Sequence, residues 1–424
     1  MKAVVLAAGR GVRLKPFTLT RPKHLLPIGG VPLLERTLIG LRDLDIKEIL
    51  IITHYMEEKI RGHFGNGSKL GLRLVYTRQE RMMGTADAFR QAQSFAGDAE
   101  FLGIYGDLYM TPGCLESVIK AHSEGETTMA VVQVEDPSKY GVVEMEGDRV
   151  TGITEKPTPG SEKSKYINAG IYVFTPAIFD WIKKTGLSKR KEYEVTDSIK
   201  MMIEARSPVR AVKLPTEDWL DIGLPWNLLD ANERILASME AAIENELEEG
   251  ARIHGPVRIG SGTRVRSSSY IEGPVVIGED CDIGPNCYIR PGTSIGSGVR
   301  VGNACEVKNS IIMDGTHIAH LSYVGDSIIG EDCNLGAGTI TANIRFDERC
   351  IKVNVEERRL DSGRRKLGAL IGDSVQTGIN VKLMPGVKVG PGAWIAPGLT
   401  VYEDIPAETF LSSSRAELKT RRIH

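Results

Sequence analysis

The sequence of 424 residues has few cysteines, no long apolar run and no excess of either charge. Its six cysteines form no CxxC pair, which argues against a zinc site or a disulfide framework and predicts reduced thiols in the cytoplasm. The longest apolar stretches have only the length of a strand, so we expect neither a signal peptide nor a membrane span. The chain has 53 basic and 55 acidic residues, and this balance disfavours binding to nucleic acid or to an anionic membrane.

A glycine-rich stretch near the N-terminus also lacks the two most familiar phosphate-binding patterns. The chain has no GxxxxGK[ST], and the third glycine of GxGxxG is missing. An apolar run at residues 3–6 predicts a buried parallel strand, and Gly9 and Gly11 follow it. Backbone N–H groups freed by these glycines, together with the charges of Arg13 and Lys23, predict a site for a nucleoside triphosphate. A solvated glycine-rich turn is the alternative for these residues alone.

The first half of the chain alternates between strand and helix patterns. Apolar runs predict strands at residues 48–53, 72–76 and 101–107, with helices at 31–44 and after Gly84. This alternation is typical of a doubly wound α/β fold, whose ligands bind beyond the carboxyl ends of the strands. Asp107 ends one such run, and Asp221 is a second isolated acid in an apolar setting further along the chain.

A helix is expected to connect this region to the rest of the chain. Apolar residues recur at helical spacing from 227 to 249, and Gly250 is expected to close the helix. The residues that carry the pattern are Leu228, Ile235, Met239, Ile243 and Leu247.

The pattern then changes to a hexapeptide repeat. From Ile253 to Val307 an aliphatic residue occurs at every sixth position, and the series continues with short slips to Val401. Hexapeptide repeats predict a parallel β-helix, in which each coil stacks on the one before it. Cysteines occupy the small-residue position of four hexads, so we expect their thiols to pack inside; they are Cys281, Cys287, Cys305 and Cys333. A charged segment at 342–367 interrupts the repeat, and a loop of this length is either functional or disordered.

Taken together, these motifs resemble the bifunctional sugar-1-phosphate nucleotidylyltransferase/acetyltransferase family, of the archaeal type, over nearly the whole chain. The resemblance implies an α/β chain with a Rossmann-like nucleotidylyltransferase domain at 1–226, a linker helix at 227–250 and a left-handed β-helix acetyltransferase domain at 251–424. The repeat by itself does not give the hand of the helix.

The resemblance also implies roles for residues of the first domain. Arg13 and Lys23 match catalytic phosphate-binding residues, and Asp107 and Asp221 match two carboxylates that hold Mg²⁺. The nucleotide is expected to contact Leu6, Ala7, Gly9, Gly11, Gln79, Gly84 and Thr85. The sugar phosphate is expected to contact Gly141, Glu155, Lys156 and Asn168.

In the second domain the resemblance implies an acetyl-CoA-dependent site with His320 as the general base. An imidazole suits this step because its pKa lies near neutral pH. Glu306 matches a residue that orients the ring, and the other expected site residues are Arg290, Lys308, Tyr323, Asn334 and Asn343. A surface histidine and a solvated basic face are the alternatives for these residues alone.

The implied activities are N-acetylation of glucosamine-1-phosphate and Mg²⁺-dependent transfer of a nucleotidyl group from UTP or dTTP, in a homotrimer built through the β-helix. Two rival interpretations stay open. One is a monofunctional nucleotidylyltransferase whose β-helix is an oligomerisation or regulatory module. The other is a non-catalytic assembly subunit, which should have lost the Gly/Arg/Lys signature that this chain retains.

The sequence leaves open the sugar epimer and the choice between UTP and dTTP.

Overall fold

The structure is a computed structural model that describes residues 1–243 and 247–413. The chain divides into two compact units. The first comprises Met1–Gly11, Arg21–Leu26 and Pro32–Gly223. The second contains Val12–Thr20, Pro27–Val31 and the chain from Leu224 onward. Two short segments near the N-terminus therefore belong with the second unit, which the sequence pattern does not indicate. No helix among the described residues is long and apolar enough to cross a membrane.

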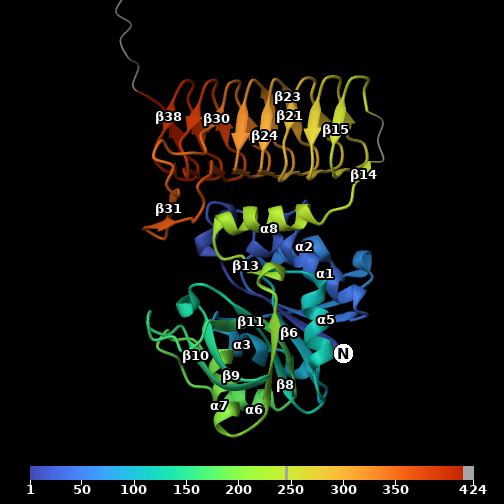
Figure 1. Cartoon of the computed structure of the whole chain (residues 1–424), viewed down its shortest axis with the longest axis vertical. Coiled ribbons are helices and arrows are strands. Elements are labelled where there is room, and N and C mark those ends of the chain that lie inside the picture. Colours follow the sequence, from blue (N-terminus) through green and yellow to red (C-terminus); the bar gives the residue numbers. More distant parts are fainter. Residues whose placement is uncertain (244–246, 414–424) are drawn as a thin grey trace, which may run out of the picture. The chain divides into compact units, whose positions relative to one another are not determined.

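The first unit is built on a nine-stranded mixed sheet (Figure 1). Its strands, in spatial order, are β5 (Arg73–Arg78), β4 (Glu48–Thr53), β1 (Lys2–Ala7), β6 (Phe101–Tyr105), β11 (Tyr166–Phe174), β8 (Thr127–Gln133), β12 (Val209–Leu214), β10 (Arg149–Glu155) and β9 (Gly141–Glu146). The first four are mutually parallel, as the alternation of strands and helices predicts, whereas β11 is antiparallel to β6 and to β8. The doubly wound pattern is thus confined to the N-terminal part of the sheet.

Both faces of this sheet are buried. Along β1, Ala3 and Val5 pack into one hydrophobic cluster and Val4 and Leu6 into another, as the alternation of side chains along a strand requires. Helices α1 (Leu33–Asp43), α2 (Glu57–Phe64) and α5 (Pro112–Ala121) contribute to the first cluster, and α3 (Thr85–Arg90), α4 (Gln93–Ala96), α6 (Ile178–Lys184) and α7 (Val195–Glu204) to the second. A separate two-stranded ribbon joins β7 (Leu108–Met110) to β13 (Trp219–Asp221).

The second unit contains a parallel β-helix with three eight-stranded faces (Figure 1). The β14 face contains β14 (Ala242–Ile243), β16 (Val257–Ile259), β19 (Val275–Ile277), β22 (Thr293–Ile295), β25 (Ile311–Ile312), β28 (Ile328–Ile329), β33 (Leu370–Ile371) and β36 (Lys388–Val389). The β15 face contains β15 (Arg252–His254), β18 (Tyr270–Glu272), β21 (Tyr288–Ile289), β24 (Glu306–Lys308), β27 (Tyr323–Gly325), β30 (Ile340–Thr341), β35 (Lys382–Leu383) and β38 (Thr400–Val401). The β17 face contains β17 (Arg264–Val265), β20 (Asp282–Ile283), β23 (Arg300–Asn303), β26 (His317–His320), β29 (Asn334–Leu335), β34 (Gln376–Thr377), β37 (Trp394–Ile395) and β39 (Phe410–Leu411).

The hexad residues form the core of this β-helix. The aliphatic positions from Val257 to Val401 belong to one continuous buried cluster. The four hexad cysteines lie in the same cluster, which confirms that their thiols point inward. Burial raises the pKa of Cys333 to about 12, so this thiol is a packing group and not a nucleophile.

The predicted helix at 227–250 is wrong for the described residues beyond Ala237, and its residues 244–246 lie outside the described part of the chain. The helix α8 spans Pro225–Ala237, and the chain then enters β14. Leu247 pairs with Val265 and packs against the β-helix core. It lies one hexad before Ile253, so the same apolar residues fit both a helical and a hexapeptide spacing, and stacking on the next coil decides between them.

Helix α8 is bonded to the β-helix through Asn232, which is fully buried. Its side-chain Nδ2 donates to the Gly292 carbonyl (2.8 Å), and its Oδ1 accepts from the Ser294 hydroxyl (2.9 Å) and from the Gly29 amide (2.7 Å). A buried side-chain amide stabilises the fold only when its hydrogen bonds are made, and here both of its polar atoms have partners. Asn232 thus joins α8 to a coil and to the turn between β2 (Pro27–Ile28) and β3 (Val31–Pro32).

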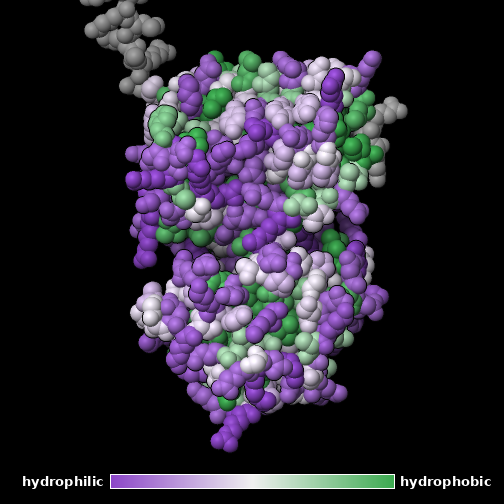
Figure 2. Space-filling model, in the orientation of Figure 1, coloured by the Kyte–Doolittle hydropathy of each residue, from purple (hydrophilic) through white to green (hydrophobic). Residues whose placement is uncertain are grey.

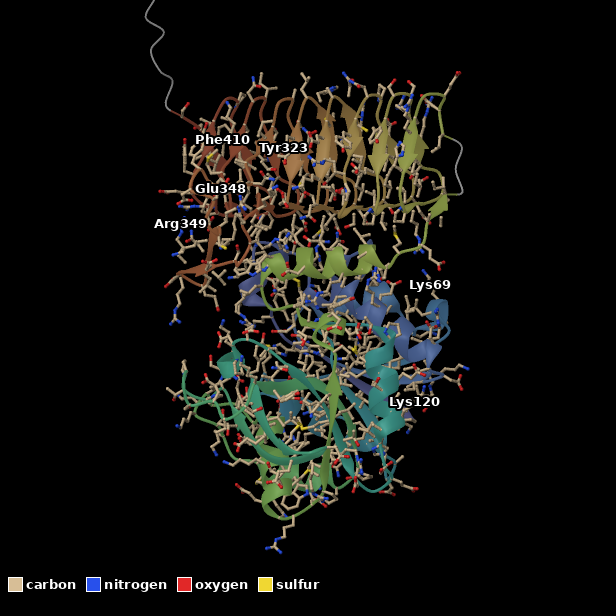
Figure 3. The ribbon with its side chains drawn as sticks, in the orientation of Figure 1. Lys69, Lys120, Tyr323, Glu348, Arg349 and Phe410 are labelled. Atoms are coloured by element: carbon tan, nitrogen blue, oxygen red, sulfur yellow. The ribbon has the colours of Figure 1, made fainter. Side chains whose placement is uncertain are left out.

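The segment at 342–367 is ordered as an antiparallel hairpin of β31 (Lys352–Val355) and β32 (Arg358–Asp361). Glu348 and Arg349, which precede the hairpin, point outward (Figure 3). In the space-filling view the region around the hairpin is predominantly hydrophilic (Figure 2). The chain then rejoins the β-helix at β33, which pairs with β28.

Candidate active sites

A cavity of about 370 Å³ in the first unit collects most of the predicted nucleotide-binding residues. The sequence-predicted residues that line it are Leu6, Gly9, Lys23, Gln79, Gly84, Thr85 and Asp107. Gly9 and Asp107 follow β1 and β6, which are adjacent and parallel. The cavity therefore lies at the carboxyl ends of these strands, where an α/β sheet binds its ligands.

Lys23 and Asp107 form an ion pair at the edge of this cavity. Burial alone would raise the pKa of Asp107, but the Lys23 ammonium outweighs it and holds the pKa below its usual range. A Cβ on Gly9 would lie 3.4 Å from Lys23 Nζ, which is an ordinary contact distance, so the ammonium lies directly beside the Gly9 backbone. This arrangement concentrates fixed charge beside a backbone turn that has room for a phosphate.

The structure brings Asp221 next to Asp107. Asp221 ends β13 and is the register partner of Leu108 in β7, and the following amide, Ile222 N, donates to the Asp107 carbonyl (3.1 Å). The described residues hold no cluster of three metal-ligating side chains. Two carboxylates fit Mg²⁺ nevertheless, because this ion is usually held by one or two carboxylates together with substrate phosphates.

Gln79, Gly84 and Thr85 form the wall of the cavity beyond β5. The Gln79 amide is buried and donates to Asp87 Oδ2 (2.7 Å) and to the Gly84 carbonyl (3.2 Å). Gly84 has a φ of +103°, and a Cβ there would lie 2.5 Å from the Tyr193 carbonyl, so only glycine fits. Thr85 Oγ1 accepts a hydrogen bond from Val195 N (2.9 Å) at the start of α7.

Three of the four predicted sugar-phosphate residues also meet in the first unit. A Cβ on Gly141 would lie 3.0 Å from Glu155 Oε2 and 3.5 Å from Asn168 Cβ. Tyr172 Oη lies 2.8 Å from Asn168 Oδ1 and 3.2 Å from Tyr105 Oη, within hydrogen-bond distance of both, and Tyr105 lines the nucleotide cavity. Lys156 follows Glu155 with an exposed side chain and a φ of +41°.

Glu194 was not among the predicted site residues, yet it is buried beside this group. Its carboxylate pairs with Arg190 (3.1 Å) and is 3.5 Å from Thr85 Oγ1. Burial and the nearby charge of Glu155 raise the pKa of Glu194 to about 7. Burial likewise raises the pKa of Glu155, whose Oε2 accepts a hydrogen bond from Thr196 (3.0 Å). Glu192 and Glu194 are visible in the sequence as two nearby acids, but Glu155, whose like charge acts on Glu194, is far away in the chain.

The remaining predicted residues of this first site lie outside the cavity lining. Ala7 is buried within β1, and Gly11 has a φ of +61° at the end of the first N-terminal segment. Arg13 lies in the 3₁₀ helix η1 (Val12–Leu14), which belongs to the second unit, and its side chain is exposed.

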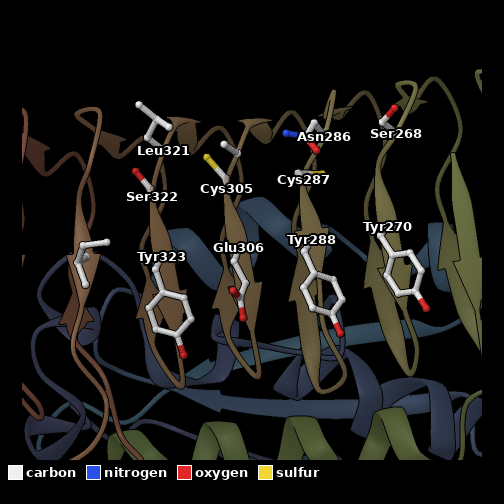
Figure 4. A pocket seen from close by; sticks show the side chains of 12 residues that line it. Ser268, Tyr270, Asn286, Cys287, Tyr288, Cys305, Glu306, Leu321, Ser322 and Tyr323 are labelled. Atoms are coloured by element: carbon white, nitrogen blue, oxygen red, sulfur yellow. The ribbon is translucent and has the colours of Figure 1, made fainter. Parts of the chain in front are cut away.

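The second unit carries a cavity of about 430 Å³ along its β15 face. Tyr270, Tyr288, Glu306 and Tyr323 lie on successive coils and point in the same direction (Figure 4). Residues of the adjacent corner, Ser268, Asn286 and Leu321, form the other side. The aromatic rows and a carboxylate thus line a groove that follows the stacking direction.

Two ion pairs and one amide surround this groove. Arg290 Nη1 donates to Glu306 Oε1 (2.7 Å), and Lys308 Nζ lies 3.2 Å from Asp326 Oδ2. Asn343 Nδ2 donates to Tyr323 Oη (3.1 Å). The structure therefore brings five predicted acetyltransferase residues together: Arg290, Glu306, Lys308, Tyr323 and Asn343. The predicted role of Glu306 in orienting His320 is not seen in the described chain, where Arg290 is the bonded partner of Glu306.

His320 and Asn334 lie on the β17 face. His320 ends β26, is exposed, and is in register with Asn303 of the preceding coil. Asn334 begins β29, also exposed, in register with His317. Both residues are therefore separated from the β15-face group by the corner that contains Leu321.

Comparison with known proteins accounts for both units. Residues 2–238 match the nucleotidyl transferase family model, and residues 271–385 match the GMPPB C-terminal domain. The chain is 42% identical over 424 residues to the bifunctional protein GlmU of Methanocaldococcus jannaschii, covering all of both chains. It is 41% identical over 389 residues to the bifunctional sugar-1-phosphate nucleotidylyltransferase/acetyltransferase of Sulfurisphaera tokodaii, covering 91% of this chain and 94% of the relative.

The chain belongs to the family of bifunctional sugar-1-phosphate nucleotidylyltransferase/acetyltransferases. It is thus an enzyme of that family, with a nucleotidyltransferase part and an acetyltransferase part. A solved structure assigned as a glucose-1-phosphate thymidylyltransferase from Bacillus anthracis is similar to 57% of the chain, with 28% identity and a TM-score of 0.50, and 98% of that structure is covered. This chain is therefore longer than the solved thymidylyltransferase structure and carries a β-helix of its own in the second unit.

Proposed function

We propose that the first unit transfers a uridylyl group from UTP to an N-acetylhexosamine-1-phosphate and releases pyrophosphate. The sugar phosphate oxygen attacks the α-phosphorus of the nucleotide while the bond to pyrophosphate breaks. Such a step needs in-line positioning and neutralised charge more than a protein nucleophile. Asp107 and Asp221 would hold Mg²⁺, which when bound neutralises phosphate charge. Lys23 and Arg13 add positive charge for the phosphates. The Glu155 carboxylate would accept hydrogen bonds from the sugar hydroxyls, and the Asn168 amide would donate to the sugar.

For the second unit we propose transfer of an acetyl group from acetyl-CoA to the amine of glucosamine-1-phosphate. The amine nitrogen attacks the thioester carbonyl, the carbon–sulfur bond breaks, and the amine proton passes to His320. His320 then returns this proton to the departing sulfur, so the coenzyme leaves as the thiol and the imidazole is neutral again. His320 suits the role because its side chain is exposed at the end of β26, and imidazole is the commonest general base for such a proton transfer. Arg290 and Lys308 supply cations for the sugar's phosphate.

The observation that carries the bifunctional proposal is the existence of two separate residue groups, one at the strand ends of the α/β unit and one on the β-helix. Assays of the purified full chain test it directly. We expect pyrophosphate release from UTP with N-acetylglucosamine-1-phosphate, and coenzyme A release with glucosamine-1-phosphate. Galactosamine-1-phosphate and dTTP in parallel reactions would resolve the epimer and the base. If no amino-sugar phosphate releases coenzyme A, the β-helix serves assembly and the monofunctional alternative holds.

We further propose that the enzyme is a homotrimer through its β-helix, as the family resemblance implies. The placement of His320 and Asn334 across a corner from the β15-face group supports this proposal, because a neighbouring copy could close the groove between them. Light scattering of the full chain after gel filtration should give three times the chain mass of 46.4 kDa. A monomeric mass with full acetyltransferase activity would rule the trimer out.

A further inference from the structure

A buried carboxylate, Asp326, is bonded to two of the proposed acetyltransferase residues, Lys308 and Asn343. Its side chain is only 3% exposed, at the corner between β27 and β28, where its φ is +50°. Its Oδ1 accepts from Asn309 Nδ2 (2.8 Å). Its Oδ2 accepts from Asn343 Nδ2 (2.6 Å) and from Lys308 Nζ (3.2 Å). Two of these donors, Lys308 and Asn343, are proposed ligand-binding residues, whereas Asp326 itself is withdrawn from the surface.

The chemistry of a carboxylate fixes the orientation of Asn343. An ionised carboxylate can only accept hydrogen bonds, so the Asn343 amide must turn its nitrogen toward Asp326. The second N–H of the same nitrogen is directed to Tyr323 Oη (3.1 Å). Both donors are then used inside the protein, and Oδ1 is left as the group that a ligand can reach. The site thereby offers an acceptor, which suits the N–H or O–H donors of an amino sugar.

The same carboxylate constrains Lys308. Charge-assisted hydrogen bonds are shorter and stronger than neutral ones, so the buried oxygen holds the flexible lysine stem in one position. The ammonium keeps two further N–H donors for a phosphate. Asp326 therefore acts on the cation and on the amide together.

A second layer of contacts supports Asp326 from behind. Glu233 Oε1, on α8, accepts from Asn309 Nδ2 (2.9 Å) and from Arg364 Nη2 (2.6 Å). Arg364 belongs to the hairpin segment, is 15% exposed, and also pairs with Asp230 of α8. The base of that segment closes on the same corner, because Gly368 N donates to the Asp326 carbonyl (2.7 Å).

We propose that Asp326 is a positioning residue of the acetyltransferase site, which fixes the Lys308 side chain and turns Asn343 Oδ1 toward the amino-sugar phosphate. The hairpin segment at 342–367 braces this arrangement through Arg364. The inference rests on the proposed acetyltransferase function, and it gives the interruption of the repeat a role in substrate binding.

The test is the Asp326→Asn variant of the full chain, assayed by coenzyme A release against glucosamine-1-phosphate. The new amide would direct N–H groups at the donors of Lys308 or Asn343, so the KM for the sugar phosphate should rise on the order of tenfold or more. The KM for acetyl-CoA and the rate of nucleotidyl transfer should not change. Asp332→Asn is the matched control, because Asp332 is also a corner aspartate with positive φ but is exposed.

A coupling experiment separates positioning from simple structural support. In an Asn343→Ala background the Asp326→Asn change should raise the KM by a smaller factor than in the wild type. Equal factors in both backgrounds would overturn the link to Asn343. Arg364→Ala keeps Asp326 and its three direct donors and removes only the support through Glu233, so it serves if Asp326→Asn fails to fold. It should raise the same KM by a smaller factor, and an unchanged KM would refute the brace.

The outcomes also distinguish this inference from the function on which it depends. A wild-type enzyme that acetylates glucosamine-1-phosphate, together with an Asp326→Asn variant of unchanged KM, refutes the positioning role alone. A wild-type enzyme that releases no coenzyme A with any hexosamine-1-phosphate refutes both.

Discussion

The two units build their sites in opposite ways. In the α/β unit, Gly9 and Asp107 follow the ends of strands whose side chains are mostly buried in the two hydrophobic clusters. In the β-helix, Glu306 and Tyr323 lie along the strands themselves, on the outward positions of neighbouring coils. An end-of-strand site gathers residues from distant parts of the chain, whereas a side-of-strand site is repeated coil by coil. The first depends on the topology of the sheet, and the second on the register between coils.

The largest expected effect comes from replacing the two proposed Mg²⁺ carboxylates, which should remove one activity and leave the other unchanged. Asp107→Ala or Asp221→Ala should reduce Mg²⁺-dependent pyrophosphate release by at least about 10³-fold, because a phosphate-bound cation would lose half of its protein carboxylates. Coenzyme A release should be unaffected, since the residues of that site lie in the other unit. Substantial uridylyl transfer by both variants at saturating Mg²⁺ would contradict the two-carboxylate assignment.

The converse variant is His320→Ala. It should lower acetyl transfer by about 10²–10⁴-fold, the usual contribution of a general base, and leave pyrophosphate release unchanged. Initial rates of coenzyme A release measure the effect, with His317→Ala as a matched control on the same strand. A near wild-type rate for His320→Ala would identify it as a surface residue.

A substitution in the β-helix core tests whether the two units also differ in how they unfold. Ile283 is fully buried in the β-helix core, so Ile283→Ala should destabilise the second unit by about 2–5 kcal/mol. Scanning calorimetry should show a lower transition temperature for the second unit of this variant. At temperatures below that transition the variant should still carry out nucleotidyl transfer. Glu279→Ala, an exposed change on a neighbouring corner, is the control. Equal shifts for the two variants would argue against a tightly packed hexad core.

The smallest expected effect is a pH dependence confined to the α/β unit. The pKa of Glu194 is raised from 4.5 to about 7, so the folded state favours its protonated form. Stability should therefore fall as pH rises between these two values, because the unfolded chain loses the proton first. In Glu194→Gln the thermal midpoint of this unit should depend less on pH over that range. The exposed Glu204→Gln should leave the slope unchanged, and an unaltered slope in Glu194→Gln would show that other groups cause it.

Much of the fold could be predicted because its periodicities are local. The hexads determine which residues face the core, including Cys281 and Cys333, and the strand at 48–53 was predicted with its observed bounds. The prediction of a helix up to Gly250 was wrong because Leu247 fits both a helical spacing and the hexad spacing that continues at Ile253. Nothing local in the sequence indicates that residues 12–20 group with the second unit.

The sites were predictable only as lists of residues. Motifs place Arg290, Glu306 and Lys308 on the β-helix, but they do not show which side chains pair. Arg290 and Glu306 are 16 positions apart, and Lys308 and Asp326 are 18 apart, which is one coil in each case. Stacking the hexads places the members of each pair on neighbouring coils but not opposite each other, because Glu306 is in register with Tyr288 and Lys308 with Gly325. Contacts such as Glu155 with Thr196 have no comparable regularity, since they depend on how the sheet is wound.

The closure of the hairpin segment has an evolutionary consequence. Leu367 N donates to the Asn343 carbonyl (3.0 Å), so the chain leaves the β-helix and returns to it at the same point. The coil below and the coil above stack as though nothing lay between them, with Ile328 beside Leu370. Additions or deletions within this excursion change the loop length without disturbing the stack, and loop length itself has only a weak entropic cost. Relatives can therefore exchange the whole segment, and with it the support of the sugar site, while the scaffold stays the same.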